Sequence, residues 1–457
     1  MSNEIFFVGS NLATLVGGCE LAKKGYRVRI FTDGAPLGGY FSGISLDGRD
    51  FDFGMFLFEQ FSNIQSGRER STINSWLENS AEISNWLNEN VKLKRAITAE
   101  VYIFGKKYPD YIMSNKLDIL LSTDVAPPNR LDVGSPYHAS NKEHSRHYDS
   151  MSYLEACKHN HGDDFHFRYI EPFIKKIIGH GSENFLARYH RFSWAPLYYP
   201  ETLADVIENN KISIPEYPFW TTNRGFAGDL VRNLKKIIDR FDNVEIIEDK
   251  ISDLKIGEST LVVNKKKYKT EGKVHLGLSM GRVSTLLGFD DQLKGEGVDF
   301  TIAIALVHRD SIKAECGCIF IVDDKFGSYR FTDQDSIAGL DPEWHRVVIE
   351  SNSKILQLKY PGKDKNRAIV QDLKFFLDIS EKERLKVLKI LNIQNGLYLP
   401  TLDFINSKKR ASDKILHITK ESVSLTGDLA GYGTSSINNQ IAQGLQLSKS
   451  YERHTKD

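Results

Sequence analysis

A short turn near the N-terminus carries the first residues whose types and spacing predict chemistry. Gly9, Asn11 and Thr14 stand at the spacing of the phosphate-binding pattern G-x-G-x-x-G, between an apolar run at 4–8 and a segment of helical periodicity. Such a turn binds a pyrophosphate because backbone N–H groups at the start of the helix, here at Leu12, point at the anion. Only the first glycine of the pattern is present, but Asn11 tolerates a left-handed backbone and Thr14 is small. The turn predicts a dinucleotide site without choosing between nicotinamide and flavin.

An acidic residue after the second strand completes this pattern, because its carboxylate binds a ribose hydroxyl. Residues 27–31 form the expected second strand, and Thr32 holds the usual position of the acid. Asp33 follows one place later, so we expect Asp33 to bind the ribose. The alternative is a turn residue ahead of Gly34.

The next glycine-rich segment indicates which dinucleotide is bound. Gly38 and Gly39 form a doublet, and residues 51–58 read F-D-F-G-M-F-L-F. Together they resemble the glycine doublet and the F-D-x-G-x-x-x-F segment of the flavin amine oxidase superfamily, which includes protoporphyrinogen oxidase, phytoene desaturase and UDP-galactopyranose mutase. A glycine pair lets backbone approach a cofactor closely, and a flat apolar strand can cover one face of a flavin ring. The resemblance implies FAD as the cofactor, with its ring near Gly54.

A second match to the same superfamily lies in the middle of the chain. Residues 223–228 read N-R-G-F-A-G and precede a predicted helix and a strand at 244–248. The resemblance implies that the backbone of the following residue, Lys250 or Ile251, contacts the adenine end of FAD. The alternative is an ordinary helix N-terminus.

The third match lies near the C-terminus, where Leu-Thr-Gly-Asp at 425–428 is followed by a glycine-rich turn at 431–438. It resembles the C-terminal flavin motif. The resemblance implies that Asp428, after Gly427, receives hydroxyls on the ribityl or pyrophosphate side. The next helix would then point its positive end at the pyrimidine edge of the flavin. The residues expected at the start of this helix are Ser436, Ile437 and Asn438.

Two residues outside these motifs are candidates for the substrate cleft. The segment 320–332 is similar to a strand of the mutase-like branch in which an arginine reaches the substrate, so Arg330 would bind a diphosphate or carboxylate. The alternative is a surface arginine paired with Asp333 or Asp335. Tyr398 precedes the C-terminal motif and would supply a hydroxyl or an aromatic wall at the ring, unless it is a plain packed aromatic.

These residues need a parallel sheet to position them. The strands at 4–8 and 27–31 flank a helix expected over 12–25, which predicts a βαβ unit. The fold we expect is α/β, with a Rossmann-like FAD-binding domain of the glutathione-reductase-like type interleaved with a mixed α/β substrate domain. The expected FAD-binding domain comprises 1–70, 216–290 and 415–457, and the substrate domain comprises 71–215 and 291–414.

Further apolar runs predict an antiparallel sheet in the substrate domain, and residues 124–150 are the segment most typical of a long loop. The runs have hairpin-like spacing and lie at 301–308, 318–322, 329–332 and 346–350.

Composition excludes several classes of protein. The length of 457 residues exceeds what one core supports, and 60 basic residues balance 60 acidic ones, so no basic field favours nucleic acid. Four cysteines cannot form a disulfide scaffold, and Cys316-Gly317-Cys318 lacks a second ligand pair, so no metal site is expected. There is no secretory signal and no apolar run of about 18 residues. We therefore expect a cytoplasmic enzyme, with peripheral membrane contact and oligomeric state left open.

The resemblance implies a redox function. The chain would be an FAD-dependent oxidoreductase that passes a hydride from a small or amphipathic substrate to flavin N5. The alternative is a non-redox isomerase of a nucleotide-sugar, in which reduced flavin N5 is the nucleophile and Arg330 holds the diphosphate. The mutases place a histidine over the flavin, whereas residues 55–59 are apolar up to Glu59, which argues against their mechanism. A third hypothesis is a flavin-binding protein without catalysis.

Overall fold

The structure, a computed structural model, describes most of the chain. Of the long loop predicted at 124–150, residues 124–149 lie outside the described residues. The described residues are 4–60, 80–113, 119, 150–193, 195–197, 219–289, 293–312, 317–379, 384–432 and 435–451.

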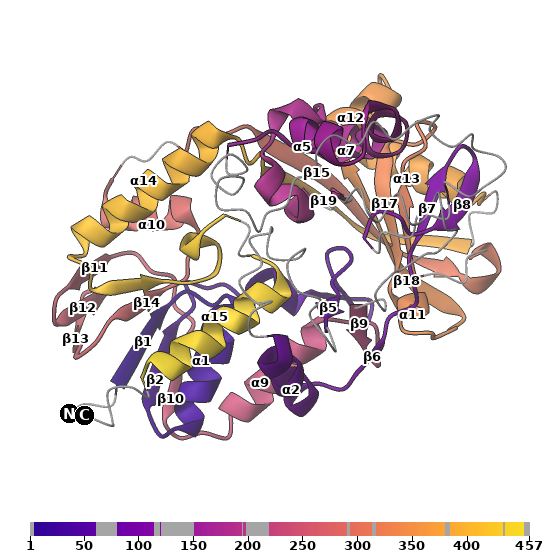
Figure 1. Cartoon of the computed structure of the whole chain (residues 1–457). Coiled ribbons are helices and arrows are strands. Elements are labelled where there is room, and N and C mark those ends of the chain that lie inside the picture. Colours follow the sequence, from indigo (N-terminus) through magenta and orange to yellow (C-terminus); the bar gives the residue numbers. More distant parts are fainter. Residues whose placement is uncertain are drawn as a thin grey trace.

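Five parallel strands form the sheet that holds the predicted phosphate-binding turn (Figure 1). Their order along the sheet is β10 (Val244–Ile247), β2 (Arg27–Phe31), β1 (Glu4–Val8), β14 (Val274–Leu276) and β20 (Val423–Leu425). The chain adds β2 and β10 on one side of β1, and then β14 and β20 on the other side. The strand order therefore reverses between β1 and β14, which is where α/β sheets bind ligands, outside the carboxyl ends of the strands.

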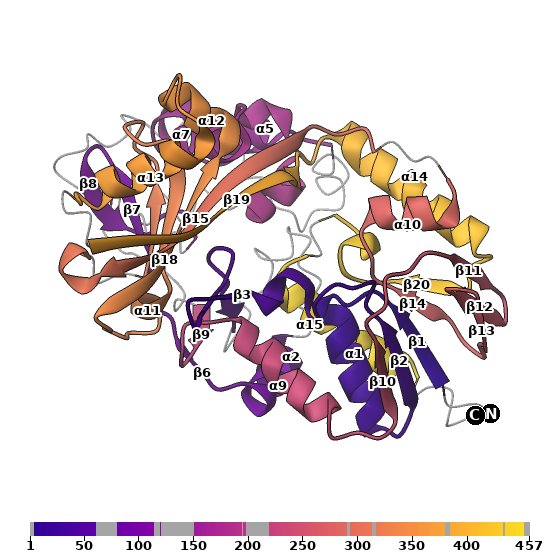
Figure 2. The ribbon, with the colours of Figure 1, turned by 180° about the vertical axis from the view of Figure 1, so that it is seen from behind.

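Helices cover both faces of this sheet because β1 alternates, with Phe7 in one core and Phe6 in the other. The Phe7 face packs against α1 (Leu12–Lys23), α9 (Gly228–Ile238) and α15 (Ile437–Ser450). The Phe6 face packs against α10 (Met280–Leu287), α14 (Leu402–Ile418) and the meander β11 (Leu254–Gly257), β12 (Thr260–Val263) and β13 (Lys266–Lys269) (Figure 2).

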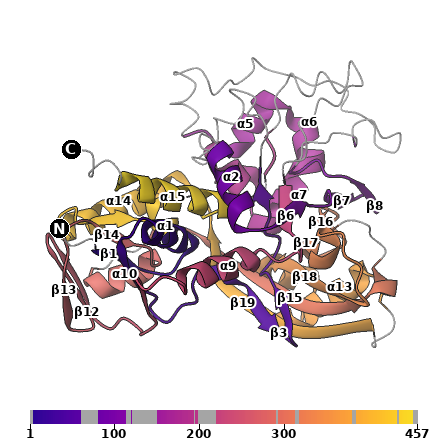
Figure 3. The same ribbon diagram turned by 90° about the horizontal axis from the view of Figure 1, so that it is seen from below.

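A second sheet of seven strands lies beside the first. Its pairs are antiparallel except β16 with β7. The strand order is β19 (Leu385–Tyr398), β15 (Gly297–His308), β18 (Trp344–Asn352), β17 (Ser328–Asp333), β16 (Cys318–Ile321), β7 (Glu100–Ile103) and β8 (Lys106–Pro109). Helices α12 (Ser353–Lys359) and α13 (Lys365–Phe376) share a core with one face, and α5 (Tyr153–Asn160) and α7 (Glu171–Ile178) share a core with the other. Figure 3 shows α13 on one side of this sheet and α5 and α7 on the other.

Smaller elements join the two sheets. They are the hairpin β3 (Ile44–Leu46) and β4 (Arg49–Phe51), the helix α2 (Ser80–Asn90), and a three-stranded sheet of β5 (Phe58–Glu59), β9 (Phe219–Thr222) and β6 (Leu93–Arg95).

The α/β fold with a Rossmann-like parallel sheet, predicted from the sequence, is confirmed. The strands predicted at 4–8 and 27–31 are present, and the helix predicted over 12–25 ends at Lys23. The antiparallel sheet is also present, but the sequence analysis did not predict β19 or α14. The division into two domains at the stated bounds stays a prediction. Within the described part of the chain, none of the helices has the length and hydrophobicity needed to cross a membrane.

Candidate cofactor site

Three glycines follow the carboxyl ends of the adjacent strands β1, β14 and β20 and allow the backbones after these strands to approach one another. Gly9 follows β1, Gly277 follows β14, and Gly427 comes two residues after β20. The Gly277 N–H donates to Val8 O at 2.7 Å, and a Cβ added at Gly9 would lie 2.4 Å from the carbonyl carbon of Gly277. Gly9 also has a φ of +121°, which disfavours other residues. We call this place, formed by residues 9–11, Gly277 and Thr426–Gly427, the switch point.

Asn11 does not adopt the left-handed conformation that its residue type allows. Its φ of −63° and ψ of 169° are extended, because it caps α1: its Oδ1 accepts the Thr14 N–H at 2.9 Å. Its Nδ2 donates to Gly277 O at 3.0 Å. Cβ atoms added at Gly277 and Gly427 would lie 2.5 Å and 2.3 Å from this nitrogen. The first turn has Asn instead of glycine at position 11. Glycines that follow two neighbouring strands, Gly277 after β14 and Gly427 after β20, leave room for the Asn11 amide.

The N–H groups at the start of α1 are partly used within the chain. Leu12 N–H donates to Oε1 of Gln440 on α15 at 2.9 Å, and Thr14 N–H is bound by Asn11. An α-helix leaves four N-terminal N–H groups without intrahelical partners. Two of the groups that a pyrophosphate would use therefore already have acceptors here.

The glycine doublet lies beside the predicted phosphate-binding turn. Gly38 N–H donates to Ser10 O at 2.6 Å, and Gly38 forms an isolated bridge with Asn11. Gly38 has a φ of +81°, and a Cβ there would lie 2.5 Å from a methyl group of Val231 on α9. The next residue but one, Tyr40, donates its hydroxyl to Ser435 O just before α15. The N-terminal and C-terminal motifs therefore meet at one place.

The C-terminal motif presents a carboxylate and a helix start. Asp428 is half-exposed and accepts a hydrogen bond from Nζ of buried Lys408, on α14, at 2.8 Å. Ser436 caps α15, with its Oγ accepting the Asn439 N–H at 3.3 Å. Ile437, the first residue of α15, is buried in the core under the parallel sheet.

Asn438 connects α15 to the segment predicted to cover the flavin. Its Nδ2 donates to Glu59 O at 2.7 Å, and its Oδ1 accepts the Glu59 N–H at 3.1 Å. The buried side chains of Met55, Leu57 and Phe58 precede this contact. Asn438 therefore fixes an apolar segment next to the helix start.

The two residues predicted at the adenine end are bonded to each other. Ile251 N–H donates to Asp33 Oδ1 at 2.7 Å, and Arg282 binds both Asp33 oxygens at 2.7 and 2.8 Å. Burial acts to raise the pKa of Asp33, but the bonds from Arg282 and Ile251 outweigh it and lower the pKa. The Ile251 carbonyl also accepts a bond from Arg282. Both groups thus have partners within the chain, and their adenosine-binding roles stay predictions.

Arg330 lies on the seven-stranded sheet, away from the switch point. It is buried and paired with Glu350, its register partner on β18, through two hydrogen bonds of 2.6 Å. The sequence-based alternative of a surface pair with Asp333 or Asp335 is therefore wrong. The Asp333 side chain instead caps the short helix Gln334–Ile337, and Asp335 forms an ion pair with Arg346. A Cβ added at Gly54 would lie 2.8 Å from Glu350 Oε1, so the predicted ring-side glycine lies against this pair.

Tyr398 is brought to the C-terminal motif by packing. Its ring stacks on Phe404 with centroids 5.0 Å apart, and its carbonyl accepts the hydroxyl of Tyr432. Nζ of Lys408, the partner of Asp428, lies 5.6 Å from the centroid of the Tyr432 ring. Tyr398 therefore belongs to an aromatic wall beside Asp428, while its role toward a substrate stays a prediction.

Asp52 of the F-D-x-G segment joins the two sheets. Its Oδ2 accepts the Ala227 N–H at the start of α9 at 2.9 Å, and Nε2 of Gln334, which follows β17, at 3.1 Å. Burial raises the pKa of Asp52 to about 7, although backbone N–H groups and Arg346 oppose the shift. Two of the predicted motifs, 51–58 and 223–228, are thus in direct contact.

These residues fit an extended dinucleotide. Glycines at 9, 277 and 427 leave the switch point without Cβ atoms at these positions, and the Asn11 amide and the Thr426 hydroxyl that lie there are themselves hydrogen-bonding groups. Helices α1 and α15 both begin there, and a helix start favours an anion. The one departure is that Asn11 and Gln440 accept two of the α1 N–H groups.

The sequence analysis missed four residues of this arrangement: Gly277, Arg282, Lys408 and Gln440. Gly277 had a signal, since a glycine directly after a short apolar run is typical of close backbone approach. The other three had none, because they meet their partners only in the fold. Leu12 and Gln440, for example, are 428 positions apart.

The doubly wound parallel sheet with its glycine turns defines a Rossmann-like dinucleotide-binding fold that carries a large second sheet. No family model and no curated protein matches the sequence. Solved structures share the fold along nearly the whole chain. Reduced UDP-galactopyranose mutase has a TM-score of 0.67 at 12% identity, covering 99% of this chain and 96% of that chain.

Two oxidases have the same fold. A putative protoporphyrinogen oxidase from Exiguobacterium sp. 255-15 has a TM-score of 0.63 at 16% identity, with 99% of both chains covered. Wild-type putrescine oxidase bound to putrescine has a TM-score of 0.58 at 12% identity, covering 98% of this chain and 99% of that chain. At these identities the comparisons establish the fold.

Proposed function

We propose that the chain is an FAD-dependent oxidoreductase that oxidises a small or amphipathic substrate. The observation that carries the proposal is that three motifs from the two ends and the middle of the chain contact one another. Tyr40 bonds Ser435 and Asp52 bonds Ala227, while Gly38 bridges to Asn11 at the switch point. The similarity in fold to protoporphyrinogen oxidase and putrescine oxidase supports a redox activity.

The residues of the switch point would hold the cofactor in an extended form. The pyrophosphate would lie over residues 9–14, near the Asn11 amide and the start of α1. Asp428 would accept hydroxyls of the ribityl side, with Lys408 fixing its carboxylate at 2.8 Å. When bound, FAD would supply a hydride acceptor at N5.

The chain's own groups would orient the substrate and exclude water. The buried segment 55–58, held by Asn438, would keep one side of the ring dry. Tyr398 and Tyr432 would form an aromatic wall that suits an amphipathic substrate. Cytoplasmic location is part of the same proposal.

A screen for reduction of bound flavin tests this activity. The purified protein is mixed without oxygen with candidate amines and polyenes, and the flavin absorbance is followed. The proposal expects one class to bleach the flavin with a stoichiometric oxidised product. If pre-reduction of the flavin is instead required and no product is oxidised, the redox assignment is wrong.

A non-redox isomerase of a nucleotide-sugar is the second candidate. It is favoured by the fold similarity to reduced UDP-galactopyranose mutase. Against it stands the bidentate pair of Arg330 with Glu350, which already uses the guanidinium edge that would bind a diphosphate. Turnover of a nucleotide-sugar without net electron transfer, and only after flavin reduction, would favour the isomerase over the oxidoreductase.

A further inference from the structure

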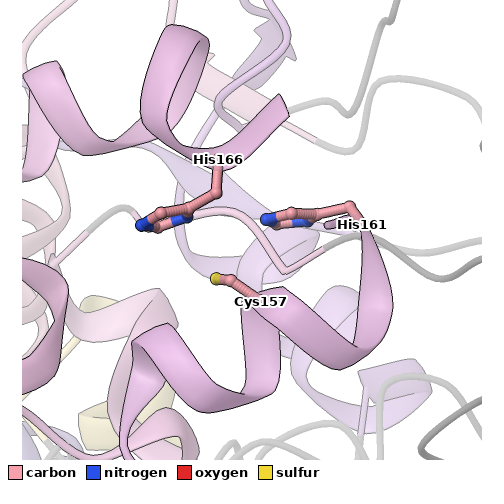
Figure 4. A group of neighbouring side chains, drawn as sticks. All are labelled: Cys157, His161 and His166. Carbon is pink, nitrogen blue, oxygen red and sulfur yellow. The ribbon is translucent and has the colours of Figure 1, made fainter. Parts of the chain in front are cut away.

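Three metal-ligating side chains converge in the helical layer that covers the seven-stranded sheet. Cys157 lies on α5, His161 follows the end of α5, and His166 begins a π-helical turn at His166–Ile170 (Figure 4). All three are buried, and their ligand atoms lie within 4.8 Å of one another. Gly162, with a φ of +78°, turns the chain between the two histidines. The two imidazole rings are nearly parallel, with 5.8 Å between centroids and 12° between planes.

The hydrogen bonds of His166 determine which of its nitrogens can bind a ligand. Its Nε2 lies 3.1 Å from Oε2 of Glu171 and 2.9 Å from Oγ of Ser182. The same carboxylate oxygen also accepts the N–H and the hydroxyl of Ser182. A carboxylate only accepts hydrogen bonds, so Nε2 carries the proton and Nδ1 presents a lone pair.

The Nδ1 atom of His166 is buried and has no hydrogen-bond partner among the residues that the structure describes. The side chain as a whole is 0% exposed. A buried acceptor without a partner costs free energy, which a bound ion would offset. A histidine that donates its other ring nitrogen to a carboxylate is the arrangement that orients imidazole ligands in metal sites.

The donor set indicates the kind of ion. One sulfur and two imidazole nitrogens suit zinc and related transition metals, whereas calcium and magnesium prefer oxygen. In a tetrahedral zinc site the ligand atoms lie about 3.3–3.6 Å apart. The ligand atoms here lie within 4.8 Å of one another, so the longest separation must shorten by at most about 1.5 Å to close on an ion. A thiolate at Cys157 and the carboxylate of Glu171 would together balance a double positive charge in this dry interior.

We propose that Cys157, His161 and His166 bind one zinc-class transition-metal ion, with a small ligand such as water in the fourth position. The site lies in the core shared by α5, α7 and the seven-stranded sheet, so the ion stabilises the packing of residues 150–193 on that sheet. It replaces the expectation that the chain has no metal site. The spacing C-x3-H-x4-H at 157–166 was the available signal. The proposal does not depend on the cofactor proposed above.

Metal analysis of the whole protein, purified without chelators or an immobilised-metal column, tests the proposal. We expect about one zinc-class ion per chain, removable by a chelator with a fall in melting temperature that added zinc reverses. Cobalt added to the metal-free protein should give the intense sulfur-to-metal absorption of a bound thiolate. Metal-free protein as purified, with no such band on cobalt addition and no zinc-dependent change in melting temperature, would overturn it.

Variants localise the ion. Cys157→Ser should abolish the cobalt–sulfur band, whereas Cys19→Ser, at a buried cysteine of α1, should leave it unchanged. Glu171→Gln should weaken metal affinity about 10–100-fold through His166. A band that persists in Cys157→Ser, or that is lost in Cys19→Ser, contradicts the assignment. If Cys157→Ser does not fold, the titration of the unaltered protein and of Glu171→Gln still decides the question.

Discussion

The two large sheets present their polar groups in opposite ways. At the five-stranded parallel sheet, the groups available to a ligand come from loops after the strands, where glycines at 9, 277 and 427 expose backbone. In the seven-stranded sheet, the charged groups lie within the strands and face each other, as Arg330 on β17 does with Glu350 on β18.

The difference teaches where binding can be expected. Backbone N–H groups at a helix start favour an anion, although two of those on α1 already donate to the neutral side chains of Gln440 and Asn11. The buried ion pair in the other sheet must be broken before either partner could bind a substrate, and breaking such a pair is costly. We therefore propose the cofactor site at the parallel sheet, and we interpret the charged pair of the seven-stranded sheet as structural.

Of the changes considered, removing one partner of the buried ion pair should lower the free energy of unfolding the most. Arg330→Met leaves Glu350 buried without its cation, so the free energy of unfolding should fall by about 3–5 kcal/mol. Denaturant unfolding measures the change. The double variant Arg330→Met/Glu350→Leu should recover most of the loss. A folded single variant of normal stability that loses only substrate affinity would show that Arg330 is a binding residue instead.

Asp52, which joins the two sheets, should give a pH-dependent stability. Its pKa is raised to about 7 in the folded chain, so between pH 4 and pH 7 the unfolded chain releases a proton that the folded chain keeps. The contribution of Asp52 to the free energy of unfolding therefore falls as the pH rises from 4 to 7. Asp52→Asn should remove this loss, gaining up to about 4 kcal/mol relative to the unaltered chain between pH 4 and pH 8.

Asp50, two residues away, provides a control of opposite sign. The guanidinium of Arg232 and other bonds hold its pKa well below the usual range, so its contribution is present at neutral pH and is lost as pH falls. Asp50→Asn should therefore destabilise the chain at pH 7 and have less effect at low pH. Parallel pH profiles for the two variants would refute the opposite environments assigned to these carboxylates.

Asp428 tests the cofactor side of the comparison. Replacing it by Ala removes the proposed acceptor for flavin hydroxyls, a charged hydrogen bond of about 1.5–3 kcal/mol, so FAD should bind at least about 10-fold more weakly. Asp413→Ala, at an exposed position of α14, is the matched control. FAD content after gel filtration measures both. Equal cofactor content in the two variants would refute the role of Asp428.

Gly277 tests the packing that makes the switch point. A Cβ there would lie 2.5 Å from Asn11 Nδ2 and 2.6 Å from Thr426 Oγ1, and overpacking of this kind costs about 1–3 kcal/mol. Gly277→Ala should lower FAD affinity about 10-fold or more by displacing Asn11. Gly281→Ala, in α10 where no atom lies within 4 Å of the added carbon, should leave affinity unchanged. The same affinity in both variants would show that Asn11 does not shape the site.

The sequence predicted the parts of this molecule that depend on local pattern. The β1–α1–β2 unit has helical and strand periodicity and a glycine at each turn. The motifs themselves were found from the sequence, but contacts between them, such as the Gly38 N–H with Ser10 O, were not predicted. The sequence also did not predict β19, whose apolar residues do not alternate strictly and whose edge position exposes much of the strand.

Hydrogen-bond partners that are far apart in the sequence could not be predicted from the local sequence pattern either. Asp33 was assigned to a ribose because its neighbours in sequence suggest that role, but Arg282, 249 positions away, binds both of its oxygens. Asn11 was judged by its backbone tolerance, whereas its side chain caps α1 and also donates to the Gly277 carbonyl, 266 positions away. In both cases the bonding partner lies hundreds of residues away in the sequence: a side chain for Asp33 and a backbone carbonyl for Asn11.

The absorbance spectrum of the purified chain tests the central claim most directly. We predict flavin absorption bands and about one FAD released per chain on denaturation, because the fold brings the three motifs into contact next to the switch point. A colourless protein whose melting temperature does not rise on addition of FAD would contradict the account.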